Sequence, residues 1–476
     1  MGATADEVRV LGVTHVQPDH QITNLRPLAD DHTMKLSFLD SFHVATGPIQ
    51  RLFFYDGPGL PPFPSIVGSL RSSLATTLPV FIPLAGKLAF RPASGDVVVD
   101  CSPSAISSSG VKFVEAEFLA GADALRRLAG DDEHDTEAFA RLVPELDDAG
   151  KLPAPVFAVQ VTRPAGNSSG VVAVGVSLHH AVADGKSFWQ FMTWWSAASR
   201  GDLLAAAPDD LVPPSFDRTA IRHPSEEELT VWILRLRAPM LPTLGRRSAG
   251  TACRRTRTFL LVADEIQSLK RRISQHLPKP ASAYVAISSL SWTCIIEAKA
   301  SSHMVHNDDD VFLIVHADCR GRLRGPPIHE GFFGNCVKPC YARARAADLM
   351  PTHRLGEHVD GLAHAAAAIQ EAIRDGLEAT GENPFSNFGE VLKYHMALPP
   401  GRASTVGSSH RFMAYQTDFG WGPPIRVELA SIFGSSDMVA LLGARDGSVQ
   451  VSVTLDGACM DAFAPDFMGV INGLKF

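Results

Sequence analysis

The sequence predicts an α/β or α+β protein of two domains, and three observations support this prediction. At 476 residues the chain exceeds what one ordinary hydrophobic core supports, so two domains of roughly 150 to 250 residues each are expected. Helical and strand patterns occur in both halves of the sequence. Between them, the stretch from Gly201 to Glu226 is rich in Pro, Asp and Ala and has weak periodicity, as is typical of a linker.

The N-terminal half contains two predicted helices and a hairpin. Residues 64–81 carry apolar side chains at four-residue steps, with Ser65 as a possible N-cap and Pro79 as a stop. Residues 154–164 and 171–180 are strand-like and flank a turn-forming cluster, which predicts a hairpin. A helix should follow Gly185 and stop at Gly201, because apolar side chains recur at steps of three and four: Phe188, Phe191, Trp195 and Ala198.

The C-terminal half alternates predicted helices and strands. We expect a helix capped by Asp264 over residues 263–274 and an Ala-rich helix over residues 354–377. Residues 282–300 are expected to form a buried helix, with a strand as the alternative because of their β-branched side chains. The apolar run 311–320 predicts a core strand. Three further strands are expected near the end, the last two joined by a hairpin turn at Asp446-Gly447: 426–432, 437–445 and 448–455.

Composition describes a soluble globular protein, with 45% hydrophobic and 20% charged residues. The net charge of -8 argues against binding to nucleic acid or an anionic membrane, which would favour a basic surface. No signal peptide or transmembrane segment is apparent, and the seven cysteines are expected to be reduced thiols in the cytosol. In that compartment the sequon at Asn167 would remain an unmodified turn.

Several common site signatures are absent or incomplete. Gly185-Lys186-Ser187 imitates the end of a P-loop, but His180 stands where the motif needs a glycine. No G-x-G-x-x-G or G-x-S-x-G is present, which disfavours a dinucleotide fold and a serine hydrolase. Two groups offer metal-ligand types at spacings too loose to predict a metal site: His316, Cys319, His329, Cys336 and Cys340, and the cluster His179, His180 and Asp184.

His180 is the candidate catalytic base. It lies at a predicted strand end, where side chains open onto clefts, and an imidazole titrates near neutral pH. Asp184 and Gly185 follow at a spacing that suits a turn organised by an acid, and His179 is expected to have a packing role. No serine, cysteine or lysine stands at matched spacing as a nucleophile, so direct transfer to a bound substrate is expected.

The stretch 417–424, TDFGWGPP, is the second unusual feature. Two glycines around one tryptophan predict a rigid bend. The indole N–H of Trp421 could stabilise a developing negative charge, and an ordinary loop is the alternative.

These two stretches together resemble the plant BAHD acyltransferases, which carry paired H-x-x-x-D and D-F-G-W-G signatures. Here the signatures are His180 to Asp184 and Asp418-Phe419-Gly420-Trp421-Gly422. Family-like segments occur in the same order along nearly the whole chain: 77–88, 214–219, 318–327 and 408–422. FFGNC at 332–336 resembles the Y-F-G-N-C box of the branch that acylates anthocyanins and other flavonoid glycosides, with Phe332 in place of tyrosine.

The resemblance implies a chloramphenicol acetyltransferase-like α/β fold: two similar-sized domains of mixed β-sheet flanked by helices, with a solvent channel between them. The implied divisions are residues 1–205 with H-x-x-x-D, a crossover linker over 206–228, and residues 229–476 with D-F-G-W-G. A cytoplasmic monomer with no metal and no bound cofactor is expected.

The resemblance also implies a mechanism. His180 deprotonates an acceptor hydroxyl, which attacks the thioester of an acyl-CoA co-substrate without an acyl-enzyme. Asp184 pairs with Arg320 and braces the turn, while the segment of Asp418, Gly420, Trp421 and Gly422 is mainly architectural. Malonyl is the expected acyl group and hydroxycinnamoyl the alternative; the expected acceptor is a flavonoid or anthocyanin glycoside.

Binding residues are expected from family position and from charge. Family position points to Lys279 and Ser282 as CoA contacts, and Lys186 is a hypothetical partner for the free carboxylate of a malonyl group. CoA phosphates need cationic neighbours, and two basic clusters are available: Arg246, Arg247, Arg254, Arg255 and Arg257, and Lys270, Arg271 and Arg272. Three alternatives stay open: an inactive small-molecule-binding relative, an enzyme for other phenolic, alcohol or amine acceptors, and one acting on carrier-protein thioesters.

Overall fold

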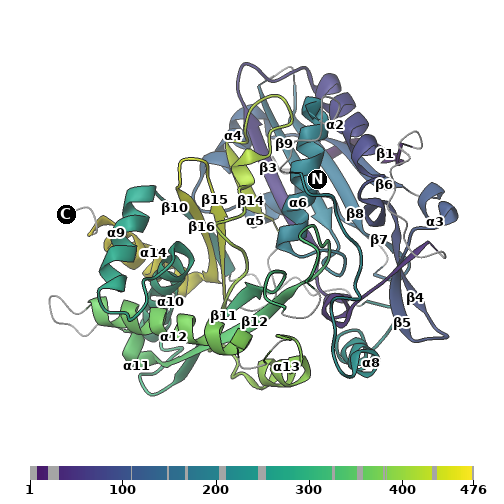
Figure 1. The fold of residues 1–476 in the computed structure, drawn as a ribbon. Coiled ribbons are helices and arrows are strands. Elements are labelled where there is room, and N and C mark those ends of the chain that lie inside the picture. The colour runs from purple at the N-terminus through teal and green to yellow at the C-terminus, as the bar shows by residue number, and fades with distance from the viewer. Residues whose placement is uncertain are drawn as a thin grey trace.

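A computed structural model describes most of the chain (Figure 1). The described residues are 8–19, 32–108, 110–146, 150–166, 170–202, 211–244, 254–323, 327–350, 358–378, 381, 383–430 and 437–473. The sequon at Asn167 and the arginines 246 and 247 lie outside these ranges.

Two mixed six-stranded sheets organise the fold. The first has the order β1-β6-β8-β9-β3-β14, in which only β6 and β8 run parallel. Its strands are β1 (Val8–Val16), β3 (Ile49–Asp56), β6 (Val111–Phe118), β8 (Phe157–Pro164), β9 (Val171–Leu178) and β14 (Arg426–Leu429).

The second large sheet has the order β10-β16-β15-β13-β11-β12, and β13 runs parallel to both of its neighbours. Its strands are β10 (Arg254–Leu261), β11 (Asp310–Asp318), β12 (Val337–Arg345), β13 (Ala403–Val406), β15 (Asp437–Gly443) and β16 (Val449–Asp456). A small antiparallel sheet joins β2 (Thr33–Lys35), β4 (Lys87–Arg91), β5 (Asp96–Asp100) and β7 (Ala154–Pro155).

Strand β14 links the two halves of the chain. It comes from the C-terminal half, yet it pairs antiparallel with β3 at the edge of the N-terminal sheet (Figure 1).

The two mixed sheets and the helices that flank them confirm the predicted α/β class. The division at residues 206–228 stays a prediction.

The helices cover the sheets in the positions that the sequence pattern indicates. Two helices pack side by side on the N-terminal sheet, α2 (Phe63–Thr77) and α6 (Gly185–Arg200). The C-terminal sheet carries α9 (Ala263–Ser274), α10 (Ala283–Ser301), α12 (His358–Glu378) and α14 (Gly457–Asn472) (Figure 1). The remaining helices are α1 (Phe38–Ser41), α3 (Pro103–Ser107), α4 (Gly121–Gly130), α5 (Thr136–Arg141), α8 (Glu226–Arg237), α11 (Ala346–Leu349), α13 (Phe388–Ala397) and two short 3₁₀ turns, η1 (Ile82–Ala85) and η2 (Ala414–Gln416).

The boundaries differ from the sequence expectation at two helix starts. The N-cap of α2 is Pro62 and not Ser65, because proline at the first turns is already fixed in a helical φ. The N-cap of α9 is Val262 and not Asp264; Glu265 accepts the Val262 backbone N–H at 3.0 Å and satisfies that helix end. Both hairpins form as predicted, β8 with β9 and β15 with β16.

Helix α6 connects the sheet to the region of His180. Asp184 caps its start, and Gly201 ends it in the left-handed conformation at φ 81°. Its aromatic stripe is fully buried in the N-terminal core, and the Trp195 indole N–H donates to Ser73 Oγ at 3.1 Å. Burying each such aromatic side chain stabilises the fold by about 1.5–3 kcal/mol.

The six described cysteines are free and buried: Cys101, Cys294, Cys319, Cys336, Cys340 and Cys459. Among the described helices none is long and apolar enough to cross a membrane.

Gly175 tests the packing of the N-terminal sheet. A Cβ there would lie 2.2 Å from the Leu142 carbonyl oxygen and 2.8 Å from Val143 Cα, both backbone atoms. We expect Gly175→Ala to lower the free energy of unfolding by about 1–3 kcal/mol, measured by urea denaturation, because overpacking forces backbone shifts. The matched control is Gly68→Ala in α2, where the new Cβ meets nothing within 4 Å; it should stabilise by up to about 1 kcal/mol. Equal effects of the two substitutions would contradict this packing.

Candidate active site

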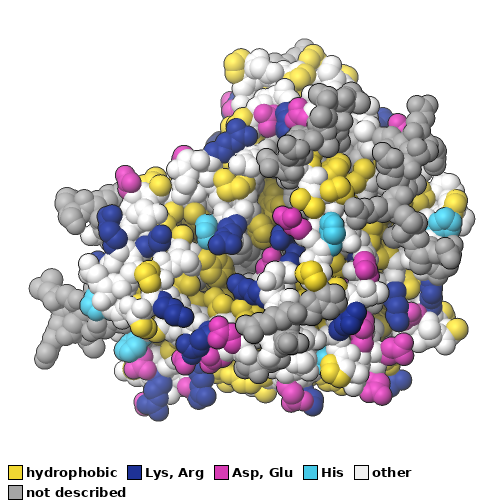
Figure 2. Space-filling model, viewed as in Figure 1, with side chains coloured by type: hydrophobic (Ala, Val, Ile, Leu, Met, Phe, Trp, Pro, Cys, Tyr) yellow, Lys and Arg dark blue, Asp and Glu magenta, His cyan; other side chains and the backbone are white. Residues whose placement is uncertain are grey.

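A large cavity of about 2020 Å³ lies between the two halves of the chain. The N-terminal half contributes the turn His180–Lys186 and the segment after α1, and the C-terminal half contributes residues of α10, α12, α13, β11 and β12. Figure 2 shows the corresponding hollow between the halves, with Lys and Arg side chains around it. Concave sites of this kind between domains are the usual place for small-molecule binding.

The turn that carries His180 leaves β9 and enters α6. Asp184 Oδ1 accepts the Ser187 backbone N–H at 3.0 Å, which caps the helix. Phe412 packs directly against Gly185, the next residue, and leaves little room for a side chain there. A Cβ at this position would lie 2.9 Å from Phe412 Cε2. The predicted turn organised by an acid is therefore present, and its glycine is needed for a close approach rather than for an unusual φ.

Asp184 and Arg320 form a buried ion pair. Arg320 Nη2 lies 2.9 Å from Asp184, and the two side chains are 3% and 2% exposed. The Cys336 backbone N–H also donates to Asp184 Oδ2 at 3.1 Å. Burial alone would lower the pKa of Arg320, but the carboxylates of Asp184 and Asp318 outweigh it and raise that pKa above its usual value. The pairing expected from the family resemblance is thus present in the structure.

Ser187 extends this pair into a clamp on residues 332–336. Its Oγ accepts N–H groups from Gly334 at 3.0 Å and Arg320 at 3.1 Å, and donates to the Gly334 carbonyl at 3.1 Å. Arg320 also donates to the carbonyls of Phe332 and Gly334. The FFGNC stretch, which in the sequence indicated only a branch of the family, therefore holds the first turn of α6.

Asn335 and Asp40 hold the His180 backbone, and sequence reasoning missed both. Asn335 Nδ2 donates to the His180 carbonyl at 2.8 Å and to Asp40 Oδ1 at 2.9 Å. The fully buried Asp40 also accepts from Ser37 and, at 3.3 Å, from Arg218 Nε. Ser37-x-x-Asp40 at the start of α1 is a capping-box spacing, the one signal that could have drawn attention to this acid.

His180 itself lines the cavity, and its pKa is lowered. Burial is the largest cause; the carboxylate of Asp184 and the backbone of His180 act in the opposite direction, and His316 and Arg51 add to the lowering. A lowered pKa keeps the imidazole neutral at pH 7, so the ring can accept a proton.

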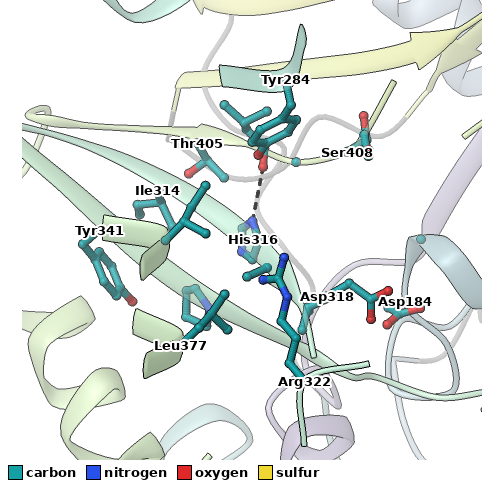
Figure 3. Close-up of a pocket in the computed structure, with 18 of the residues that line it drawn as sticks. Asp184, Tyr284, Ile314, His316, Asp318, Arg322, Tyr341, Leu377, Thr405 and Ser408 are labelled. Atoms are coloured by element: carbon teal, nitrogen blue, oxygen red, sulfur yellow. Dashed lines mark hydrogen bonds between the residues drawn. The ribbon is translucent and has the colours of Figure 1, made fainter. Parts of the chain in front are cut away.

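Two further histidines face the cavity and were not predicted as parts of this site. His43 stacks on His180 with ring centroids 3.9 Å apart and planes 5° apart. His316 projects from β11, and its Nδ1 lies 3.2 Å from the Val406 carbonyl oxygen (Figure 3). Its side chain is exposed to the cavity, yet the surrounding walls remove it from bulk water and lower its pKa.

Lys186 lines the same cavity and makes an ion pair. Its Nζ lies 3.3 Å from Asp318 Oδ2, and the two side chains are 46% and 44% exposed. Asp318 also accepts from Arg320 Nη1 at 2.9 Å, so one carboxylate links Lys186 to the buried clamp. Figure 3 shows Asp318 beside Asp184 at the cavity wall.

Lys279 and Ser282 also line the cavity, at the start of α10. Ser282 Oγ accepts the Val285 N–H at 3.2 Å as the N-cap of the helix. Further cations line the cavity: Lys270, Arg237, Arg322, Arg374 and Arg411. The described arginines of the first predicted basic cluster are not lining residues, and Arg254 and Arg255 pair with carboxylates of Asp437, Glu133 and Asp461.

The D-F-G-W-G segment packs away from His180. Asp418 Oδ1 accepts the backbone N–H groups of Gly420 at 2.8 Å and Gly422 at 2.9 Å; both glycines have positive φ, 103° and 98°. Trp421 contacts Tyr55 edge-on, with centroids 5.7 Å apart, and does not line the cavity. The geometry therefore gives no support to an oxyanion role for the Trp421 indole.

No described group of three or more His, Cys, Asp or Glu side chains is placed to hold a metal ion. The three cysteines of the loosely spaced ligand group, Cys319, Cys336 and Cys340, are buried, and His179 Nδ1 accepts the Ala181 N–H at 3.2 Å within the turn.

The chain is similar to known proteins in sequence and in fold. The sequence model described as the Transferase family matches residues 12–469. The chain is 29% identical to the malonyl-coenzyme:anthocyanin 5-O-glucoside-6'''-O-malonyltransferase of Salvia splendens, over 97% of this chain and 95% of that protein. It is 28% identical to phenolic glucoside malonyltransferase 1 of Arabidopsis thaliana, over 93% and 92%. Vinorine synthase has a similar fold, with a TM-score of 0.69, 18% identity and 98% coverage of both chains.

The Asp184–Arg320 pair can be tested by removing the cation. We expect Arg320→Leu to lower the free energy of unfolding by about 3–5 kcal/mol, because it leaves a buried carboxylate unpaired. Lys186→Ala, which removes an exposed ion pair with a neighbouring carboxylate, is the matched control and should cost less than about 1 kcal/mol. Urea denaturation measures both; a loss below 1 kcal/mol for Arg320→Leu would show that the clamp is not a stabilising feature.

Proposed function

The chain belongs to the transferase family of BAHD acyltransferases and is itself an acyltransferase, and from this premise we propose that it transfers a malonyl group from malonyl-CoA to a hydroxyl group of a phenolic glycoside. Flavonoid and anthocyanin glucosides are the proposed acceptors. Support for this substrate pair comes from the similar proteins, which are named as malonyltransferases of anthocyanin and phenolic glucosides. We further propose that it acts as a monomer in the cytoplasm, where the buried free cysteines would stay reduced.

The observation that carries the proposal is the position of His180, on a clamped turn in the wall of a cavity large enough for two substrates, where burial lowers the pKa of its imidazole. In the proposed reaction His180 accepts the proton of the acceptor hydroxyl as its oxygen attacks the thioester carbonyl. The tetrahedral intermediate then collapses, the C–S bond breaks, and the imidazolium returns the proton to the CoA thiolate. The proton taken from the acceptor hydroxyl thus leaves with the CoA thiol, and no acyl-enzyme forms.

The cavity suits the charged groups of the proposed donor, malonyl-CoA. CoA carries phosphates, for which the lining lysines and arginines are suitable partners, and we assign Lys279 and Ser282 to that side. Lys186 is assigned to the free carboxylate of the malonyl group, since its Nζ lies on the wall next to the His180 turn. The carboxylate of Asp318 holds Lys186 in place and would compete with the malonyl carboxylate for the Lys186 ammonium.

His180→Ala tests the base. We expect kcat to fall by about 10²–10⁴ in thiol-release assays with malonyl-CoA and flavonoid glucosides, because the hydroxyl is no longer deprotonated. In the unmodified protein, kcat/KM should stay high below pH 6.5 and fall only where His180 becomes protonated, since its pKa is lowered. The control is His329→Ala, an exposed histidine outside the cavity that should leave both properties unchanged. Activity of His180→Ala near the unmodified rate would exclude this mechanism.

Lys186→Ala tests the acyl group. We expect kcat/KM for malonyl-CoA to fall about tenfold or more while that for acetyl-CoA changes little, because only malonyl presents a carboxylate that a cation can bind. Lys270→Ala is the matched control, a second cavity lysine that should affect both donors alike. An equal fall in kcat/KM for malonyl-CoA and acetyl-CoA in Lys186→Ala would show that Lys186 does not select the acyl donor.

A further inference from the structure

One face of the His180 imidazole is covered by another imidazole. The rings of His43 and His180 are stacked and nearly parallel, with 5° between their planes and centroids 3.9 Å apart, and both residues line the cavity. Rings in this arrangement are in face-to-face van der Waals contact. His43 therefore excludes water from one side of His180 and leaves the ring edge open to the cavity.

One buried residue, Asp40, links the two backbone segments that carry the rings. His43 follows α1, and its backbone N–H donates to the Asp40 carbonyl at 3.0 Å. The Asp40 side chain accepts from Asn335, whose Nδ2 also donates to the His180 carbonyl at 2.8 Å. Phe42, next to His43, lies under the guanidinium of Arg237 at 4.5 Å. The stack is thus built by a connected network and is not a chance contact of two mobile side chains.

The charges around the pair favour one proton at most, and place it on His180. His43 faces His180, Arg237, His316 and His179, and burial followed by these groups lowers its pKa well below the usual value. His180 faces Arg51 and His316, but also Asp184, whose carboxylate favours the protonated ring. Two imidazolium rings at this spacing would repel each other strongly in a low-dielectric cavity. His43 therefore stays neutral when His180 takes a proton.

The hydrogen bonding of the His43 ring also bears on how it contacts His180. The Nδ1 atom of His43 is buried and has no hydrogen-bond partner within the described residues. The same holds for His180 Nδ1, so neither Nδ1 atom links the two rings by a hydrogen bond, and their contact is face to face.

We propose that His43 is a positioning residue for His180: its face holds the catalytic imidazole in one plane and shields it from water, while its nitrogens take no part in proton transfer. This inference rests on the proposed role of His180 as the base. It predicts that another flat aromatic side chain can replace His43 and that a small one cannot.

The test compares His43→Phe with His43→Ala by the pH profile of kcat/KM. His43→Phe should keep kcat within about threefold and leave the acid limb unchanged. His43→Ala should lower kcat about tenfold or more and move the acid limb up toward pH 6.5, because water reaches His180 and burial no longer lowers its pKa. If His43→Ala does not fold, His43→Asn takes its place. A purely structural role would lower the amount of active protein without moving the acid limb.

A titration without substrates separates this inference from the proposed function. With ¹³C-labelled histidine, the His180 ring resonance, identified by its loss in His180→Asn, should titrate at the same pH in the unmodified protein and His43→Phe, and at a higher pH in His43→Ala. An unchanged titration in His43→Ala would overturn the proposal, and so would equal rate losses in His43→Phe and His43→Ala. If the titration shifts as expected but no malonyl transfer is found, the proposed function fails and the positioning role stands.

Discussion

The buried pair of Asp184 and Arg320 is the interaction on which the rest of the site depends. It joins the first turn of α6, in the N-terminal half, to the end of β11 and the 332–336 stretch, in the C-terminal half. Because both side chains are almost fully buried, each would be costly alone, and the pair is stable only with its additional donors and acceptors. The cavity wall that carries His180 is therefore fixed by a contact between halves rather than by its own turn.

Burial also explains the chemical character of the cavity. His43, His180 and His316 all have lowered pKa values, and in each case desolvation is the largest cause. The backbone of His180 and the carboxylate of Asp184 moderate this lowering of the His180 pKa, so His180 is the ring best suited to gain a proton and lose it again. Cations such as Lys279 and Arg374 line the same cavity, where they suit an anionic cosubstrate.

Local patterns in the sequence were sufficient for most elements and for the centre of the site. The apolar period and the terminal Gly201 predicted α6, and turn residues predicted both hairpins. The His180–Asp184 spacing and Arg320 followed from a resemblance carried by short motifs, and the structure brings these residues together.

What the sequence did not predict depends on contacts between distant segments. Asn335 donates to the His180 backbone across 155 positions of the sequence. His43 contacts the His180 ring from the segment after α1, far earlier in the chain. The pairing of β14 with β3 is equally non-local, because the residue pattern of a strand does not indicate which strand it will pair with. Trp421 had suitable chemistry for charge stabilisation, but its packing against Tyr55 keeps it away from the cavity.

Direct transfer by His180 is the central claim, and it can be measured without knowing the acceptor position. Radiolabelled malonyl-CoA is mixed rapidly with the protein in stoichiometric amounts, first without and then with a phenolic glucoside. Direct transfer predicts no burst of CoA thiol and no labelled protein in the first case, and equal amounts of thiol and labelled glucoside in the second. A burst of thiol with label retained on the denatured protein, before any acceptor is added, would contradict it.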